Sequence, residues 1–111
     1  MITVAETPEY AKRAAKLLSE SERTGLISYL AAHPSAGDVM EGTGGVRKIR
    51  WARRGRGKSG GVRVIYFYYN EGIPLYLLTI YGKNEKDNLS DGERNALAKL
   101  VHLLVRTALK R

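Results

Sequence analysis

Three consecutive stretches with the residue pattern of β-strands, at residues 46–52, 62–69 and 75–81, most constrain what this chain can fold into. The first stretch alternates in character, and alternation predicts a strand with two different faces. The second is rich in β-branched and aromatic residues, which favour strands. The third is strongly apolar, which predicts an interior place in a sheet. A glycine-rich tip at residues 53–61 and a turn at residues 70–72 join them, so we expect an antiparallel meander.

The alternation of the first predicted strand also assigns its side chains to faces. Starting from Val46, every second residue points the same way, which places Lys48 and Arg50 together. Arg47 and its own alternate neighbours, Ile49 and Trp51, are expected on the opposite face.

Helix signals precede the predicted meander. Thr7 followed by Pro8 is a typical helix start, with the threonine as N-cap and the proline at the first helical position. A second helix is predicted over residues 21–32, and Pro34 ends it. We expect these two helices to form a hairpin, preceded by a short strand at residues 2–6.

A further helix follows the meander. Ser90 and Glu93 match a capping box, and an apolar stripe at helical spacing runs from Leu97 to Ala108. The predicted fold is therefore α+β, with a small antiparallel sheet flanked by an N-terminal helical hairpin and a C-terminal helix. We expect a single domain over residues 1–111, because that length supports one modest core.

Composition excludes several classes of site. The chain has no cysteine, so disulfides and thiolate metal sites are excluded. No apolar run approaches the roughly 20 residues that cross a bilayer, and the first residues lack the pattern of a secretory signal. We therefore expect a cytoplasmic protein that does not enter a membrane.

Positive charge is concentrated in one part of the sequence. The chain has 19 lysines and arginines against 11 acidic residues, yet no acidic residue lies between Glu41 and Glu71. That window holds eight basic residues, which leaves the rest of the chain formally neutral. They are Arg47, Lys48, Arg50, Arg53, Arg54, Arg56, Lys58 and Arg63. A localised excess of this kind predicts a polyanion-binding site, and the interleaved aromatic rings favour RNA.

Other chemistries fit the residues poorly. His33 and His102 form no metal-binding spacing, so no metal site is predicted. The stretch from Gly55 to Ser59 has only a superficial likeness to a phosphate-binding loop, because the first glycine of that motif is missing and a strand follows. RNA cleavage through a 2′-hydroxyl needs a base, an acid and a cation that stabilises the phosphorane, and a basic cluster could supply them.

Three segments resemble the RelE/HigB branch of bacterial toxins from toxin–antitoxin systems. They read GTGGVRKIR from Gly42, GKSGGVRVIYF from Gly57 and LLTIYGKNE from Leu77, within a region of likeness over residues 37–90. The resemblance implies a RelE-like, microbial-ribonuclease-like fold. It also implies a toxin that cleaves mRNA in the ribosomal A site without a metal or other cofactor. The implied partners are the ribosome with its mRNA and a cognate antitoxin, and the toxin subunit is expected to be monomeric outside the antitoxin complex.

The resemblance also assigns roles to residues. It implies that Arg63 stabilises the transition-state phosphate and that Lys48 and Arg50 act in proton transfer or phosphate binding, with Lys83 as a further basic position. The family also has a base-stacking tyrosine near the start of the terminal segment, where this chain instead reads Asp87, Asn88, Leu89 and Ser90. Tyr81 is the residue expected to substitute for it. The other expected RNA-binding residues are Arg47, Arg53, Arg54, Arg56 and Lys58.

Two alternatives remain open from the sequence. The related ParE toxins poison DNA gyrase, although the basic set at Lys48, Arg50, Arg63 and Lys83 argues against that target. A non-catalytic RNA-binding module would satisfy the charge pattern alone. The sequence does not identify the general base or acid.

Overall fold

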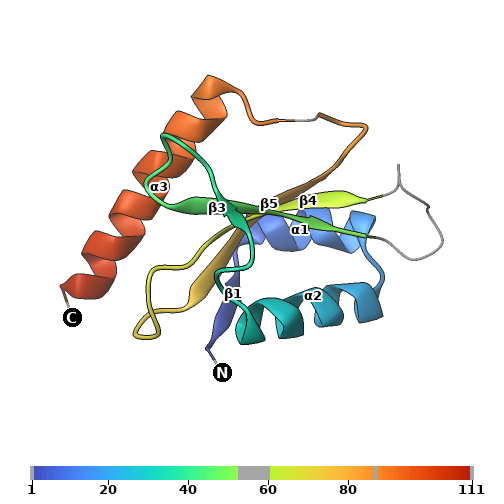
Figure 1. Cartoon of the computed structure of the whole chain (residues 1–111), viewed down its shortest axis with the longest axis horizontal. Coiled ribbons are helices and arrows are strands. Elements are labelled where there is room, and N and C mark those ends of the chain that lie inside the picture. The colour runs from blue at the N-terminus through green and yellow to red at the C-terminus, as the bar shows by residue number, and fades with distance from the viewer. Residues whose placement is uncertain (1, 53–60, 87, 111) are drawn as a thin grey trace.

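A computed structural model describes residues 2–52, 61–86 and 88–110 of the chain. Its centre is a five-stranded sheet in the order β1-β5-β4-β3-β2 (Figure 1). The strands are β1 Val4–Glu6, β2 Asp38–Val39, β3 Val46–Trp51, β4 Val62–Phe67 and β5 Leu75–Gly82. The helices are α1 Pro8–Leu17, α2 Glu20–Ala32 and α3 Asp91–Leu109. The α+β class is confirmed.

The predicted meander forms the middle of the sheet. β3 pairs antiparallel with β4, and β4 pairs antiparallel with β5. β5 is an interior strand, as its apolar sequence predicted, because β1 covers part of its other edge. The register is irregular between Ile65 and Tyr66, where β5 carries one extra residue opposite β4.

Two short edge strands differ from the prediction. β1 pairs parallel with β5, so the sheet is mixed rather than purely antiparallel. β2 is not among the predicted strands, and it pairs with β3 through only two residues, Asp38 and Val39. Strands this short show no residue period, and their pairing depends on where the tertiary fold places them.

The two N-terminal helices begin at capping residues. The Thr7 side chain accepts from the backbone N–H of Tyr10, as predicted. α2 begins earlier than predicted, because Ser19 and Glu22 form a capping box that the sequence analysis missed. α1 and α2 follow each other directly and share one buried cluster on the same face of the sheet. Their arrangement matches the predicted helical hairpin only roughly.

The face of the sheet under α1 and α2 holds the larger cluster of buried side chains. Tyr10, Leu26 and Leu30 from the helices pack against strand residues such as Val64 and Leu77. Tyr66 lies in this cluster and is fully buried, but its hydroxyl reaches the loop before β2. That hydroxyl accepts from Gly37 N at 2.8 Å and donates to Pro34 O at 2.9 Å.

Replacing Tyr66 by phenylalanine should destabilise the fold by about 1–3 kcal/mol, because it leaves the buried Gly37 N–H and the part-buried Pro34 carbonyl without their partner. Burial raises the pKa of the Tyr66 hydroxyl, so the donor stays protonated across the neutral range. Urea unfolding of the variant measures the effect. Tyr69→Phe is the control, since the Tyr69 side chain is 47% exposed. Equal midpoints for the two variants would contradict this account.

The opposite face of the sheet is only partly covered, by α3. Val101 is buried there together with Val46 and Phe67, and Leu97 and Leu104 pack against them. In Figure 1, α3 crosses one end of the sheet and its last turns extend beyond the strands. Leu103 and Leu109 are exposed on those turns. The other end of this face is therefore not covered by a helix.

Candidate functional site

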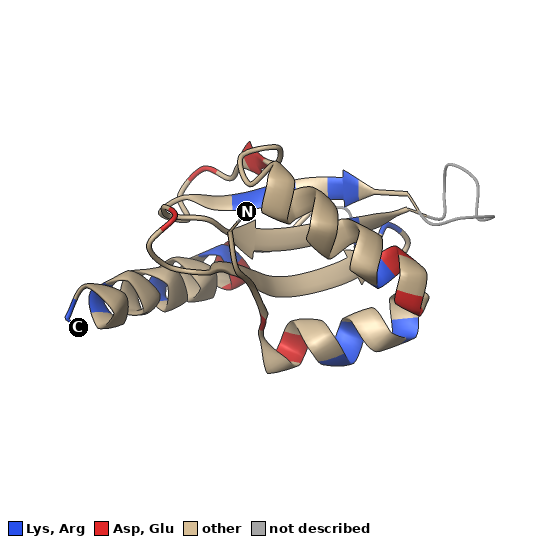
Figure 2. Cartoon of the chain, turned by 90° about the horizontal axis from the view of Figure 1, so that it is seen from below, with Lys and Arg blue, Asp and Glu red and all other residues tan. Residues whose placement is uncertain are grey.

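A row of three side chains crosses the end of the sheet that α3 leaves uncovered. Arg50 on β3 pairs with Arg63 on β4, and Arg63 pairs with Tyr81 on β5. Directly paired residues share a face, with Cβ atoms about 4.5–5.5 Å apart. None of β3, β4 and β5 carries an acidic residue, so this row has no carboxylate on its own strands (Figure 2).

The Arg50–Arg63 pair is unfavourable for folding. Like charges directly opposite each other destabilise a sheet. In addition, one terminal guanidinium nitrogen of Arg63 is buried and has no hydrogen-bond partner among the described residues. Local conflicts of this kind are expected at functional sites, where a ligand supplies what the fold does not. A phosphate oxygen is an acceptor that suits both guanidinium groups.

A second row lies next to the first, towards α3. Lys48 pairs with Ile65, and Ile65 pairs with Thr79. The ammonium group of Lys48 donates to Oδ1 of Asn88 at 3.2 Å. The alternation of β3 thus places Lys48 and Arg50 on one face, as the sequence predicted, and the strand register places Arg63 on that face too.

Tyr81 is the third member of the first row, and it is 1% exposed. The Lys86 ammonium lies 5.2 Å from the centroid of its ring. The family resemblance led us to expect that Tyr81 stacks on an RNA base. In this arrangement its ring is covered, so stacking requires the covering side chain to move.

Arg47 lies on the other face of β3, opposite Tyr66. Its guanidinium group donates to Gly37 O at 2.7 Å and to Ser35 O at 3.1 Å. These contacts hold the loop before β2 against the sheet. The position of Arg47 therefore favours a structural role over the RNA contact predicted from the charge count.

The remaining predicted site residues are at or beyond the strand ends. Lys83 is exposed and directly follows β5, and its backbone N–H faces Gly61 O at 3.4 Å. Arg53, Arg54, Arg56 and Lys58 lie outside the described residues. The structure thus brings Lys48, Arg50, Arg63 and Tyr81 together, with Lys83 just past the end of β5.

A comparison with protein families matches most of this chain. The chain matches the family described as the RelE toxin of the RelE/RelB toxin–antitoxin system over residues 31–111. This region runs from the end of α2 through α3 and contains both rows. The chain belongs to the RelE toxin family. Family membership makes it a toxin of a toxin–antitoxin system and implies a cognate antitoxin as its partner.

The histidines of this toxin lie away from the rows. His33 caps α2 and contacts the Tyr29 ring, with centroids 4.8 Å apart. His102 is exposed on α3. Within the described ranges, no three His, Cys, Asp or Glu residues come together as metal ligands would. Among the same residues, no helix has the length and apolar character needed to cross a membrane.

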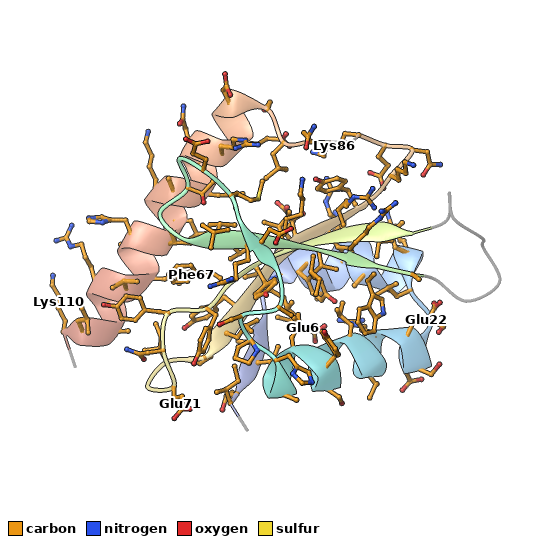
Figure 3. The ribbon with its side chains drawn as sticks, viewed as in Figure 1. Glu6, Glu22, Phe67, Glu71, Lys86 and Lys110 are labelled. Atoms are coloured by element: carbon orange, nitrogen blue, oxygen red, sulfur yellow. The ribbon has the colours of Figure 1, made fainter. Side chains whose placement is uncertain are left out.

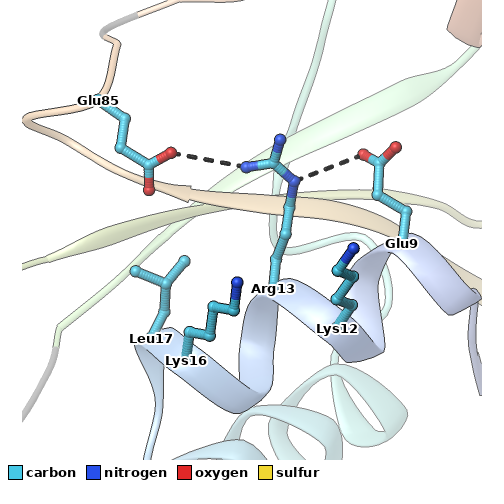
Figure 4. A pocket seen from close by; sticks show the side chains of 6 residues that line it. All are labelled: Glu9, Lys12, Arg13, Lys16, Leu17 and Glu85. Atoms are coloured by element: carbon cyan, nitrogen blue, oxygen red, sulfur yellow. Dashed lines mark ion pairs between the residues drawn. The ribbon is translucent and has the colours of Figure 1, made fainter.

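A cavity of about 590 Å³ lies beside α1 rather than on the two rows. Figure 4 shows Arg13 at its centre, paired with Glu85 at 3.5 Å and with Glu9 at 3.9 Å. Lys12 and Lys16 line the same cavity. Its two carboxylates oppose anion binding, so it fits a phosphate less well than the Arg50–Arg63 pair does.

Sequence reasoning missed the residues that cover the rows. The segment that connects β5 to α3 crosses this face and contributes Lys86, Asn88 and Leu89. Lys86 forms an ion pair with Glu93, and Leu89 is buried beside Tyr81. The capping box identified Glu93 as a helix-capping residue, but no pattern in the sequence indicated its ion pair with Lys86.

The Lys86–Glu93 pair should make the free energy of unfolding of the toxin depend on pH in the acidic range. The hydrogen bond from Lys86, followed by that from the Ser90 backbone, holds the pKa of the Glu93 carboxyl below its usual range. A group whose pKa is lower in the folded state stabilises the fold above its unfolded pKa, and this contribution is lost as pH falls through the folded pKa. Urea midpoints from about pH 6 to about pH 3 should therefore fall less steeply for Glu93→Gln than for wild type. Parallel curves would contradict the assignment.

Proposed function

We propose that this toxin is a ribosome-dependent endoribonuclease that cleaves mRNA in the A site and so inhibits translation. The observation that carries the proposal is the Arg50–Arg63 pair on strands that carry no carboxylate. Because translating ribosomes are the target, the proposal places the toxin in the bacterial cytoplasm.

The proposed reaction is attack of a ribose 2′-hydroxyl on the adjacent phosphorus. A bond forms between the 2′-oxygen and phosphorus, and the bond from phosphorus to the 5′-oxygen breaks. Negative charge builds on the phosphate oxygens as the phosphorane forms. Fixed donors aimed at such charge are often the largest single contribution to catalysis. Arg63 is the proposed donor, and its buried nitrogen without a hydrogen-bond partner among the described residues supports that role.

Arg50 and Lys48 have supporting roles in the proposal. Arg50 is exposed and directly opposite Arg63, so it can bind a second oxygen of the same phosphate. Lys48 is one row away and is oriented by Asn88, which suits it to proton transfer or to a neighbouring phosphate. Lys83 would contact the RNA beyond the end of β5. In this scheme arginine and lysine side chains supply the positive charge that a metal ion would otherwise supply.

Primer extension on a reporter mRNA in a reconstituted translation system tests the proposal. Wild-type toxin should produce cuts at A-site codons when ribosomes are present and none when they are omitted. Adding EDTA to ribosome-free reactions on naked RNA separates contaminating metal-dependent nuclease from the toxin. Absence of cuts from a folded, antitoxin-free toxin on translating ribosomes would overturn the proposal, and a gyrase supercoiling assay would then test the ParE-like alternative.

A further inference from the structure

We propose that Lys86 is a positioning residue that covers the ring of Tyr81 in the free toxin and gives way to a nucleobase of single-stranded RNA, with Glu93 as its anchor. The proposal rests on the proposed function, since it concerns how RNA engages the same face. It extends that function by naming the side chain that decides when Tyr81 can stack.

Lys86 contacts both Tyr81 and Glu93. Its ammonium group lies 5.2 Å from the Tyr81 ring centroid and is also paired with Glu93. Figure 3 marks Lys86 on the segment between β5 and α3. Tyr81 is 1% exposed, although it belongs to the same row as Arg50 and Arg63. The ring nearest the proposed phosphate site is therefore covered by a cation.

This cover is held weakly. The Lys86 and Glu93 side chains keep 31% and 42% of their exposure, so solvent screens the ion pair. The Tyr81 ring is buried, but the lysine that contacts it is partly exposed, so solvent also weakens the cation–π contact. A nucleobase covers more of the ring than an ammonium group does, and stacking on aromatic side chains is tolerant of sequence. A base can therefore replace the ammonium group without a large loss.

Lys86 can move while its neighbours stay in place. The backbone before it is fixed by a turn in which Glu85 N–H donates to Gly82 O and Gly82 N–H donates to the Glu85 carboxylate. After it, Leu89 is buried. A cavity of about 200 Å³ adjoins the Lys86 side chain, and Thr79, Leu89 and Glu93 are among its other lining residues. The lysine stem can swing there without displacing the core.

The incoming partner has to suit both Tyr81 and Lys86. Released from the ring, Lys86 remains a cation on a long stem next to a bound RNA strand, where it can meet a phosphate. Single-stranded RNA offers both groups, a base for Tyr81 and a phosphate for Lys86.

Fluorescence of a non-cleavable, single-stranded oligonucleotide that contains 2-aminopurine tests the proposal without ribosomes or catalysis. Stacking on tyrosine quenches the probe. At a salt concentration high enough to suppress phosphate contacts, Lys86→Ala should tighten quenching by about two- to fivefold, the factor that matches an exposed cation–π contact. Glu93→Gln should act in the same direction and keeps the helix cap, because glutamine also serves in a capping box. Lys99→Ala, an exposed lysine on α3, should change nothing.

The same substitution in a Tyr81→Leu variant shows whether the tighter binding of the oligonucleotide depends on the Tyr81 ring. With Tyr81→Leu, Lys86→Ala should no longer tighten binding and should only lose a cation. Equal loss of binding on Lys86→Ala in both backgrounds would overturn the proposal and leave Lys86 a plain phosphate contact.

A measurement on the wild-type toxin covers the case in which Tyr81→Leu fails to fold. In proton NMR, the ring current of Tyr81 should shift the ε-methylene protons of Lys86 upfield in the free toxin, and the shift should disappear when the oligonucleotide binds. A shift that persists in the complex would overturn the proposal. Because neither readout depends on cleavage, a toxin that proves inactive on ribosomes would leave both readouts interpretable.

Discussion

Replacing Arg63 by alanine should lower the rate of mRNA cleavage by about 10²–10³-fold, the loss seen when one preorganised donor is removed from a developing oxyanion. Arg63 occupies the centre of its row, with Arg50 on one side and Tyr81 on the other. No other residue of that row can place a guanidinium group at the same point. Single-turnover primer extension with saturating ribosomes measures this loss directly.

Two further variants sharpen this prediction. Arg63→Lys keeps the charge but loses the fork that binds two phosphate oxygens, so its rate should lie between those of wild type and alanine. Lys99→Ala changes an exposed lysine on α3 and should cut at the wild-type rate. The unfolding midpoint of Arg63→Ala should not fall, because the substitution removes a like-charge pair. A folded Arg63→Ala toxin with full activity would contradict the role assigned to Arg63.

Leu77→Ala should destabilise the fold by about 2–5 kcal/mol, a large part of what a small domain has. Leu77 is fully buried on β5, pairs with Tyr66 on β4 and with Glu6 on β1, and its carbonyl accepts from Thr7 at the start of α1. Truncating it leaves a cavity where the sheet, β1 and α1 meet. Urea unfolding followed by circular dichroism measures the change.

Leu103→Ala is the matched control for this core substitution. Leu103 is 58% exposed on α3, so the same chemical change should shift the free energy of unfolding by no more than about 0.5 kcal/mol. Similar losses for the two leucines would show that the cluster under α1 and α2 is not the main source of stability.

The central strands and the helix caps could be predicted from the sequence because their signals are local. Alternation in residues 46–51 assigned the faces of β3, and the capping box at Ser90 fixed the start of α3. The parallel pairing of β1 and the existence of β2 could not be predicted, since two or three residues carry no period and their partners lie about 10 to 70 positions away.

The candidate site was predicted in part. Strand alternation with the family resemblance grouped Lys48, Arg50 and Arg63, and the sheet register brings them to one face. The charge count treated Arg47 as equivalent to them, although alternation already placed it on the other face. The cover over Tyr81 depends on a contact between Lys86 and a residue of the next helix, and no local pattern reports such a contact.

The overhang of α3 has a consequence for how local stability is distributed along the chain. The first turns of this helix are tied down by the capping box and by Leu97 and Val101, whereas Leu103 and Leu109 gain little from the sheet. Amide hydrogen exchange should therefore quicken steadily towards residue 109, through openings that leave the strands protected. Because the arginine pair lies at the opposite end of the sheet, such fraying leaves the proposed phosphate site assembled. A partner that binds the end of α3 would then order it at the expense of conformational entropy, without first having to break the core.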